Sequence, residues 1–229
     1  RQVEDFGASE SDVSFGRYYK ASTDNYNFVA MDHNTPGAAN ANPKVGPVVI
    51  NEIMYHPDWP ANSPYGNESF EYVELYNITG SAVNLFNEQG NSWEFTDGIE
   101  FTFPEDMNIP AYGYLLVVKD PAAFSWRYPG VPAGKILGPY DGQLSNSGEK
   151  LELSMPGDVD MFGTRYYIRI DRVSYSDGSH PEDSPGGVDL WPVEADGGGK
   201  SLGRLVPGNY GNDVINWAAK SPSPGAANP

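Results

Sequence analysis

The chain has 229 residues, of which 39% are hydrophobic and 13% aromatic, and this composition argues against disorder along its length. Its formal net charge of −17 disfavours binding to nucleic acid or to anionic membranes, because such a surface repels phosphate groups. Cysteine is absent, which excludes disulfides and thiolate chemistry, and no apolar run approaches the roughly 20 residues needed to span a bilayer.

Glycine and proline interrupt the sequence often, with 26 Gly and 20 Pro. The apolar runs between them are short, and none holds a helical period over about 10 residues. We therefore expect an all-β protein with many loops and almost no helix.

Residues 1–43 resemble the C-terminal end of the same chain. Three pairs of segments occur in the same order: Ser14–Arg17 with Ser201–Arg204, Asn27–Ala30 with Asn216–Ala219, and Thr35–Asn40 with Ser223–Asn228. Only the end of a unit occurs twice, so we interpret residues 1–43 as the C-terminal remnant of a preceding repeat plus linker, and residues 44–229 as one complete domain. Chance similarity between loops rich in Gly and Pro is the alternative.

Two strands open the complete domain. Val48–Tyr55 and Phe70–Asn77 are rich in branched and aromatic residues and end in turn signals, so they are predicted to be neighbouring central strands. The later runs predicted to form strands are Ala82–Leu85, Trp93–Phe95, Ile99–Phe103, Tyr114–Val118, Leu151–Met155, Tyr166–Tyr175 and, as the last strand, Ser201–Val206. Residues 120–142 are predicted to be loops. Such a series indicates an antiparallel β-sandwich.

Several of these runs together resemble the lamin tail domain family. The motifs are Val49–Tyr55, Glu71–Asn77, Val83–Leu85, Trp93–Ile99, Pro110–Val118, Leu144–Glu149 and Ser223–Gly225, in family order over about residues 48–228. The resemblance implies an immunoglobulin-like β-sandwich of the kind found in exported bacterial proteins, and a binding or spacing module without agreed catalytic residues. Long insertions at about 121–142 and 156–165 depart from the family pattern.

Acidic residues crowd the stretch 177–196. Asp177, Asp183, Asp189 and Asp196 are candidate calcium ligands, because calcium takes oxygen ligands from loops. Solvated acids in turns are the alternative. No other cofactor is expected.

Aromatic residues in loops are the remaining hint of a ligand site. Trp59, Tyr65, Trp126 and Trp191 lie in segments rich in Pro and Gly, where they can stack on sugars or anchor a protein partner. Capping of the sandwich ends is the competing interpretation.

Two glutamates, Glu52 and Glu74, lie inside otherwise apolar strands. Buried carboxylates must be hydrogen-bonded or paired, so we expect a structural network, with Arg169 or Arg172 as candidate partners. By strand alternation, Glu52 is expected to share a face with Ile50 and Met54.

Residues Gly199–Gly203 match the pattern G-x-S-x-G of a hydrolase nucleophile, but a strand is expected there instead of the strand–turn–helix that this chemistry needs. We therefore predict no enzymatic activity. The preferred hypothesis is a non-catalytic extracellular or cell-surface module of a tandem-repeat protein, serving assembly, adhesion or spacing, with other copies or neighbouring repeats as partners and a fibre as one form. The alternative is an accessory carbohydrate- or protein-binding domain of an exported hydrolase, with polysaccharide as ligand.

Overall fold

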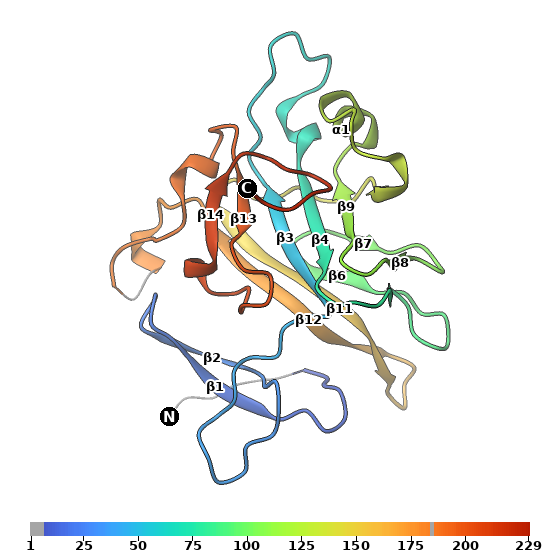
Figure 1. Ribbon diagram of the computed structural model, residues 1–229, viewed down its shortest axis with the longest axis vertical. Helices are drawn as coiled ribbons and strands as arrows, with labels where there is room; N and C mark the ends of the chain where they lie inside the picture. The colour runs from blue at the N-terminus through green and yellow to red at the C-terminus, as the bar shows by residue number, and fades with distance from the viewer. Residues whose placement is uncertain (1–6, 184–185) are drawn as a thin grey trace.

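Two β-sheets pack face to face in the computed structural model, which describes residues 7–183 and 186–229 (Figure 1). The larger sheet has the strand order β10-β9-β4-β3-β13-β14, and the facing sheet has the order β12-β11-β6-β7. The bounds are β3 Val48–Met54, β4 Tyr72–Asn77, β6 Glu94–Asp97, β7 Phe101–Thr102, β9 Tyr114–Val118, β10 Ile136–Leu137, β11 Gly148–Val159, β12 Arg165–Ser176, β13 Ser201–Arg204 and β14 Trp217–Lys220. The predicted all-β sandwich is confirmed.

Smaller elements surround the sandwich. Two further two-stranded sheets are β1 Phe15–Lys20 with β2 Asn25–Ala30, and β5 Val83–Asn84 with β8 Asn108–Ile109. The helices are α1 Pro121–Arg127 and the short 3₁₀ helices Asn67–Phe70, Ala133–Lys135, Pro181–Asp183, Val193–Ala195 and Val214–Asn216. Within the described ranges, no helix has the length and apolar character required to cross a bilayer.

Strands β3 and β4 are antiparallel neighbours at the centre of the larger sheet, as predicted, with Val48 opposite Asn77 and Met54 opposite Tyr72. All seven residues of β3 are buried. Both faces of this sheet are therefore covered, which explains why the strand reads as a nearly continuous apolar run.

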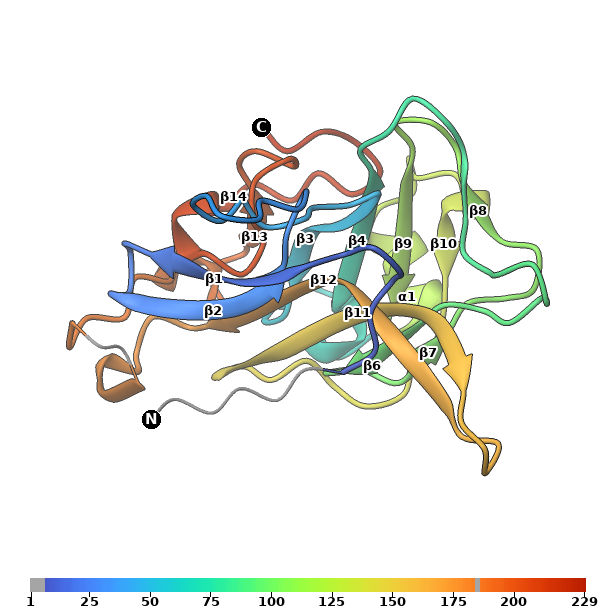
Figure 2. The same ribbon diagram turned by 90° about the horizontal axis from the view of Figure 1, so that it is seen from below.

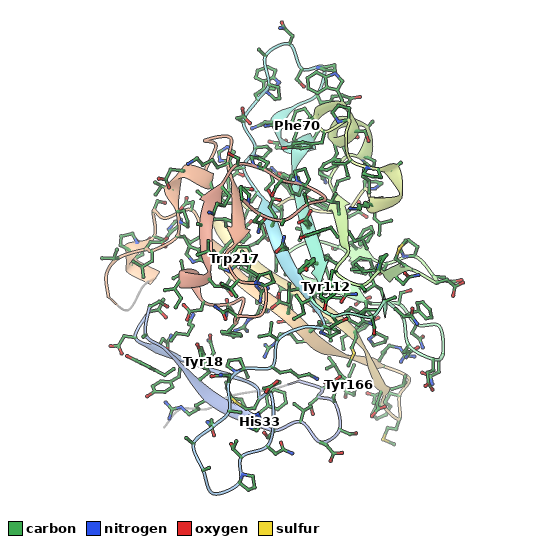
Figure 3. The ribbon with its side chains drawn as sticks, viewed as in Figure 1. Tyr18, His33, Phe70, Tyr112, Tyr166 and Trp217 are labelled. Carbon is green, nitrogen blue, oxygen red and sulfur yellow. The ribbon has the colours of Figure 1, made fainter. Side chains whose placement is uncertain are left out.

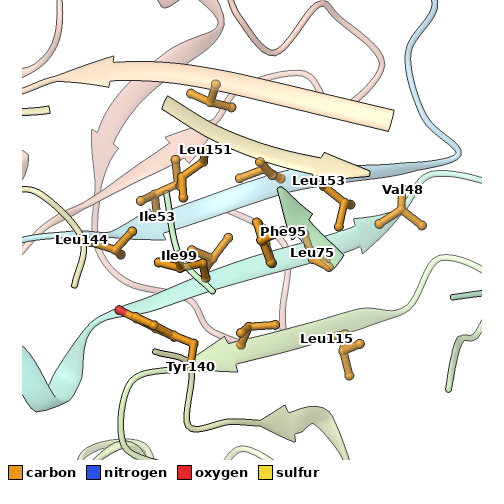
Figure 4. Close-up of a cluster of buried hydrophobic side chains, with 14 of the residues drawn as sticks. Val48, Ile53, Leu75, Phe95, Ile99, Leu115, Tyr140, Leu144, Leu151 and Leu153 are labelled. Carbon is orange, nitrogen blue, oxygen red and sulfur yellow. The ribbon is translucent and has the colours of Figure 1, made fainter. Parts of the chain in front are cut away.

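The inner face of the larger sheet and the smaller sheet form the main core (Figure 4). Buried side chains that meet there include Val48, Ile53, Leu75, Phe95, Ile99, Leu115, Leu151 and Leu153. A second, smaller cluster covers the outer face of the larger sheet and consists of Met54, Tyr72, Leu116, Val118 and Phe124. Phe124 belongs to α1, so this helix covers the outer face.

Three expectations about elements were wrong. Residues 121–127 form α1 and not a loop, because Asp120 caps the helix through Ala122 N and Ala123 N, and Pro121 occupies its first turn. Seven residues are too few to show a helical period. Strand β13 is not the last, because β14 follows and pairs with it. The sandwich is also not wholly antiparallel, because β10 pairs with β9 in parallel.

A bulge in β3 changes which side chains share a face. The pairing with β4 shifts between Ile50 and Glu52, so that both Ile50 and Ile53 enter the main core. Glu52 faces the other way and hydrogen-bonds Tyr72 of the outer cluster. The expectation that Glu52 shares a face with Ile50 was therefore wrong.

Candidate functional site

Trp59, Tyr65, Phe70 and Trp126 form an aromatic cluster. Helix α1, which carries Trp126, lies at one end of the sandwich (Figure 1), and Phe70 lies beside it (Figure 3). Ring centroids are 6.3 Å apart for Tyr65 and Trp126, 6.2 Å for Tyr65 and Phe70, and 6.0 Å for Phe70 and Trp126. Trp59 Nε1 donates to Tyr65 O at 3.1 Å. The structure thus brings together three of the four aromatic residues predicted to bind a ligand.

One side of the aromatic cluster is buried and the other is exposed to solvent. Phe70 is fully buried, whereas the exposed fractions of Trp59 and Trp126 are 70% and 45%. The Trp126 indole packs on Phe70, and the Trp59 indole is held by its bond to Tyr65 O. Exposed indole rings held in place offer flat apolar surfaces, which suit the C–H faces of sugars or the anchor residues of a protein partner.

Arg127 fixes the loop before Phe70 against α1. Its Nη1 donates to Asp58 O at 2.9 Å, its Nη2 forms an ion pair with the Asp58 carboxylate, and the guanidinium lies 5.1 Å from the centroid of the Phe70 ring. The loop that carries Trp59 and the helix that carries Trp126 are therefore held in one arrangement.

Trp191 lies apart from this cluster. It is half-buried, its ring centroid is 6.2 Å from that of Trp217, and it packs against the main core. Its backbone N donates to Asp189 Oδ1 at 3.0 Å. The structure therefore assigns Trp191 to the core margin, separate from the surface that the other three aromatic residues share.

The predicted calcium ligands bond mainly to their own loop. Asp177 Oδ1 accepts from Ser179 N at 2.8 Å, and Asp189 Oδ2 accepts from Ser176 Oγ at 2.5 Å. Asp196 pairs with His56, and the side chain of Asp183 lies outside the described residues. In the part that the structure describes, no three His, Cys, Asp or Glu residues form a group that could hold a metal ion. Calcium binding here stays a prediction.

Glu52 and Glu74 form the predicted buried network. Glu52 accepts from Ser201 Oγ at 2.5 Å, Tyr72 OH at 2.7 Å and Ser223 N at 3.1 Å. Glu74 accepts from Asn51 Nδ2 at 2.9 Å and Gly225 N at 2.5 Å. Burial raises the pKa of Glu52 and raises that of Glu74 to about 8.

The proposed arginine partners were wrong. Arg169 lies 3.8 Å from Glu152 on the smaller sheet, and Arg172 also belongs to that sheet. Their strand faces β3 across the core, so neither guanidinium reaches the outer face where the two glutamates lie. Neutral hydroxyl and amide donors satisfy these carboxylates instead, which agrees with their raised pKa values.

Ser201 has no nucleophile geometry. It is fully buried at the start of strand β13, and its Oγ donates to Glu52. A hydrolase serine needs an exposed oxygen on a sharp turn next to a base. The structure therefore gives Ser201 a role in packing.

Two charged groups that the sequence did not single out are also buried. Arg204 Nη1 donates to Asp171 Oδ2 at 2.6 Å and to Ile50 O at 3.0 Å, and it links the two sheets. Glu71 Oε2 accepts from Tyr140 OH at 2.6 Å and Leu144 N at 3.0 Å, and burial raises its pKa to about 7. The apolar residues around Glu71 could have predicted that this carboxylate is buried, whereas no local pattern predicted the burial of Arg204.

Hairpin β1–β2 reproduces hairpin β13–β14. Arg17 pairs with Phe28 as Arg204 pairs with Trp217. The pairs before them also correspond, with Gly16 opposite Val29 and Gly203 opposite Ala218. The loop after each hairpin is also alike: Asn40 Nδ2 donates to Arg17 O at 3.2 Å, and Asn228 Nδ2 donates to Arg204 O at 3.0 Å. Matching sequence segments thus adopt matching structures.

Comparison with known proteins gives a family. The family model described as Lamin Tail Domain matches residues 41–176, which is more than half of the chain, so the chain belongs to this non-catalytic, immunoglobulin-like family. No curated protein and no solved structure matches. The matched residues end with β12, but β13 pairs with β3 inside the larger sheet, so the folded domain extends beyond the match.

Proposed function

We propose that this chain is a non-catalytic structural module of a tandem-repeat protein, in which lamin tail domains follow one another and serve assembly, adhesion or spacing outside the cell. The repeated terminal hairpin, with its identical register and its asparagine contact, is the observation that carries the proposal.

The hairpin β1–β2 also packs on the complete domain in a defined way. Lys20 Nζ donates to Asn212 O at 3.1 Å, Ser22 Oγ donates to Asp213 Oδ1 at 2.5 Å, and the ring centroids of Tyr18 and Tyr210 are 5.4 Å apart. Consecutive copies held by such contacts have a fixed relative orientation, which suits a spacer or a fibre subunit.

Electron microscopy of the native protein tests this proposal, with a chain beginning at Lys44 as the matched control. Ordered chains or filaments formed by the native protein and absent from the control would support assembly through the extra hairpin. Their loss in a chelator would place calcium at the joints. Discrete monomers at every concentration would contradict self-assembly.

The aromatic cluster favours a second candidate, an accessory domain that binds carbohydrate. Gel electrophoresis through soluble polysaccharides checks it. The native protein should be retarded, and Trp59→Ala and Trp126→Ala should each raise the apparent dissociation constant for the polysaccharide at least tenfold. Tyr166→Ala is the control, because Tyr166 is 50% exposed and lies on β12 away from the cluster. Equal mobility in gels with and without polysaccharide would contradict this candidate.

A further inference from the structure

The complete domain shows what a terminal hairpin of this kind holds. Strand β13 lies between β14 and β3, with Leu202 opposite Ile53 and Gly203 opposite Glu52. The loop after β14 closes over β3, because Asn228 Nδ2 donates both to Asn51 O and to Arg204 O, at 3.0 Å each. The hairpin and its loop thus clamp strand β3 from two sides.

Two buried carboxylates accept hydrogen bonds from this clamp. Ser201 Oγ, Ser223 N and Ser223 Oγ donate to Glu52, and Gly225 N donates to Glu74. The donors come from the hairpin and its loop, and both acceptors come from the β3–β4 pair. The clamp therefore recognises a strand pair with a buried glutamate on each strand.

The N-terminal hairpin carries the same donors without that strand pair. By alignment, Ser14 corresponds to Ser201, Thr35 to Ser223, Gly37 to Gly225 and Asn40 to Asn228. Within the described residues, β1 and β2 form a two-stranded sheet, with no third strand beside β1.

A groove is lined by residues that correspond to those contacting β3 in the complete domain. It has a volume of about 540 Å³ and its lining includes Ser14, Asn34, Thr35 and Asn40. The loop already has the shape seen in the complete domain: Ala38 N donates to Thr35 O at 3.1 Å, as Ala226 N donates to Ser223 O at 3.0 Å, and φ is +76° at Gly37 and +85° at Gly225.

Resting on the proposed function, we infer that this groove is a docking site for the β3–β4 strand pair of a preceding copy of the domain, equivalent to residues 44–200, that has no other terminal hairpin. The Ser14 and Thr35 hydroxyls and the backbone amides of Thr35 and Gly37 then donate to the glutamates of that copy that are equivalent to Glu52 and Glu74. Asn40 bridges Arg17 O and the docked strand. Strands β1 and β2 thus complete the β-sandwich of the preceding copy as its last two strands, and their contacts with the following domain form the joint.

Hydrogen–deuterium exchange tests the inference, because the chain contains its own reference segments. In the native protein, residues 14–17 and 35–37 should exchange at least tenfold faster than residues 201–204 and 223–225. In an extended chain, with a second copy of residues 44–200 placed directly ahead of Ser14, the two sets should exchange within about threefold of each other. Unchanged fast exchange of residues 14–17 in the extended chain would overturn the inference, as would equal protection already present in the native protein.

A point substitution separates docking from a general effect of the extension. Asn40→Ala should restore at least tenfold faster exchange of residues 14–17 in the extended chain, whereas Asp32→Ala, an exposed position in the same loop, should leave it unchanged. Equal effects of the two substitutions would contradict the clamp. Because docking in the extended chain is intramolecular, it can succeed where the native protein forms no filaments, so the two proposals fail separately.

Discussion

At the scale of single residues, Arg204 shows how much one buried charge supports. Its side chain is 0% exposed and donates to Asp171, Ile50 O and Asn209 O. Asp171 Oδ2 also accepts from Ile50 N at 2.9 Å, so Arg204 neutralises a carboxylate that is tied to β3. Removing one partner of a buried pair leaves the other charge without compensation.

We therefore expect Arg204→Ala to lower the free energy of unfolding by about 3–5 kcal/mol. The repeat supplies a matched control: Arg17 is exposed and lies 4.2 Å from the centroid of the Tyr26 ring, so Arg17→Ala should cost less than about 1 kcal/mol. Urea unfolding followed by circular dichroism measures both. Similar losses for the two variants would contradict the argument.

The buried glutamates predict a pH dependence. Burial raises the pKa of Glu71 to about 7 and that of Glu74 to about 8, above the ordinary value of 4.5. The folded state therefore binds more protons than the unfolded state between about pH 4.5 and 8. The free energy of unfolding should fall as pH rises through this window, by up to about 1.4 kcal/mol per pH unit for each group.

Glu74→Gln should flatten this dependence and stabilise the protein at pH 8, because the amide is neutral and its oxygen can still accept from Gly225 N. The exposed Glu182, where the pKa is lowered, is the control position, and Glu182→Gln should leave the slope unchanged. Thermal melts from pH 5 to 8.5 measure the effect. A slope for Glu74→Gln equal to that of the native protein would rule out Glu74 as its source.

The sequence predicted Glu52 and Glu74 as buried but not their donors. Their position inside apolar strands required a partner, and this reasoning is local. The partners Ser223 and Gly225 lie 171 and 151 positions away, on a loop whose closure over β3 depends on the whole sheet. Charge complementarity alone pointed to arginines, and only the strand order shows that these lie on the other sheet.

At the scale of elements, α1 depends on the residue that caps its N-terminus. Asp120 Oδ1 accepts from Ala122 N at 2.8 Å and Ala123 N at 3.1 Å, and the helix has only seven residues. So short a helix draws little stability from its own hydrogen bonds, so its cap and the packing of Phe124 decide whether it forms.

Asp120→Ala should lower the free energy of unfolding by about 1 kcal/mol, the usual cost of losing an N-cap. Because α1 carries Trp126, the variant should also red-shift tryptophan emission as this side chain becomes more exposed, whereas the control Glu105→Ala, a substitution in an exposed loop, should leave the spectrum unchanged. Chemical unfolding and fluorescence spectra measure the two effects. An Asp120→Ala variant as stable as the native protein would show that packing alone forms the helix.

Strands were easier to predict than their partners. Alternation and branched residues predicted β3, β4, β9 and β12 close to their observed bounds, because each strand has a face that must be buried, whereas β11 extends well beyond both ends of the predicted Leu151–Met155. Strand β14 was recognised only as part of a repeat, because Trp217–Lys220 is too short to alternate. The order of strands in the larger sheet depends on contacts between distant segments, and no local pattern contains it.

At the scale of the whole molecule, the two copies of the terminal hairpin contribute differently to the core. Among the residues that the structure describes, none in either core cluster precedes Val48. The hairpin β1–β2 lies beside β12 (Figure 2), and residues 26–30 and 167–172 are among those that line a cavity of about 240 Å³ between them. The N-terminal copy is therefore an attachment to the sandwich, whereas the C-terminal copy contributes Leu202 and Trp217 to its core.

A pair of deletions tests this division. A chain beginning at Lys44 should keep a cooperative thermal transition and lose about 1–3 kcal/mol, because it forfeits only a few contacts such as those of Lys20 and Tyr18. A chain ending at Lys200 should not fold, because it exposes the edge of β3, removes Leu202 and Trp217 from the core, and leaves Glu52 and Glu74 without their donors from residues 201–225.

Circular dichroism and the dispersion of amide resonances measure both chains. Loss of cooperative folding in the chain beginning at Lys44 would make residues 1–43 part of the sandwich itself. A folded chain ending at Lys200 would show that the last two strands are dispensable. That result would also remove the structural reason for a preceding copy to need β1 and β2.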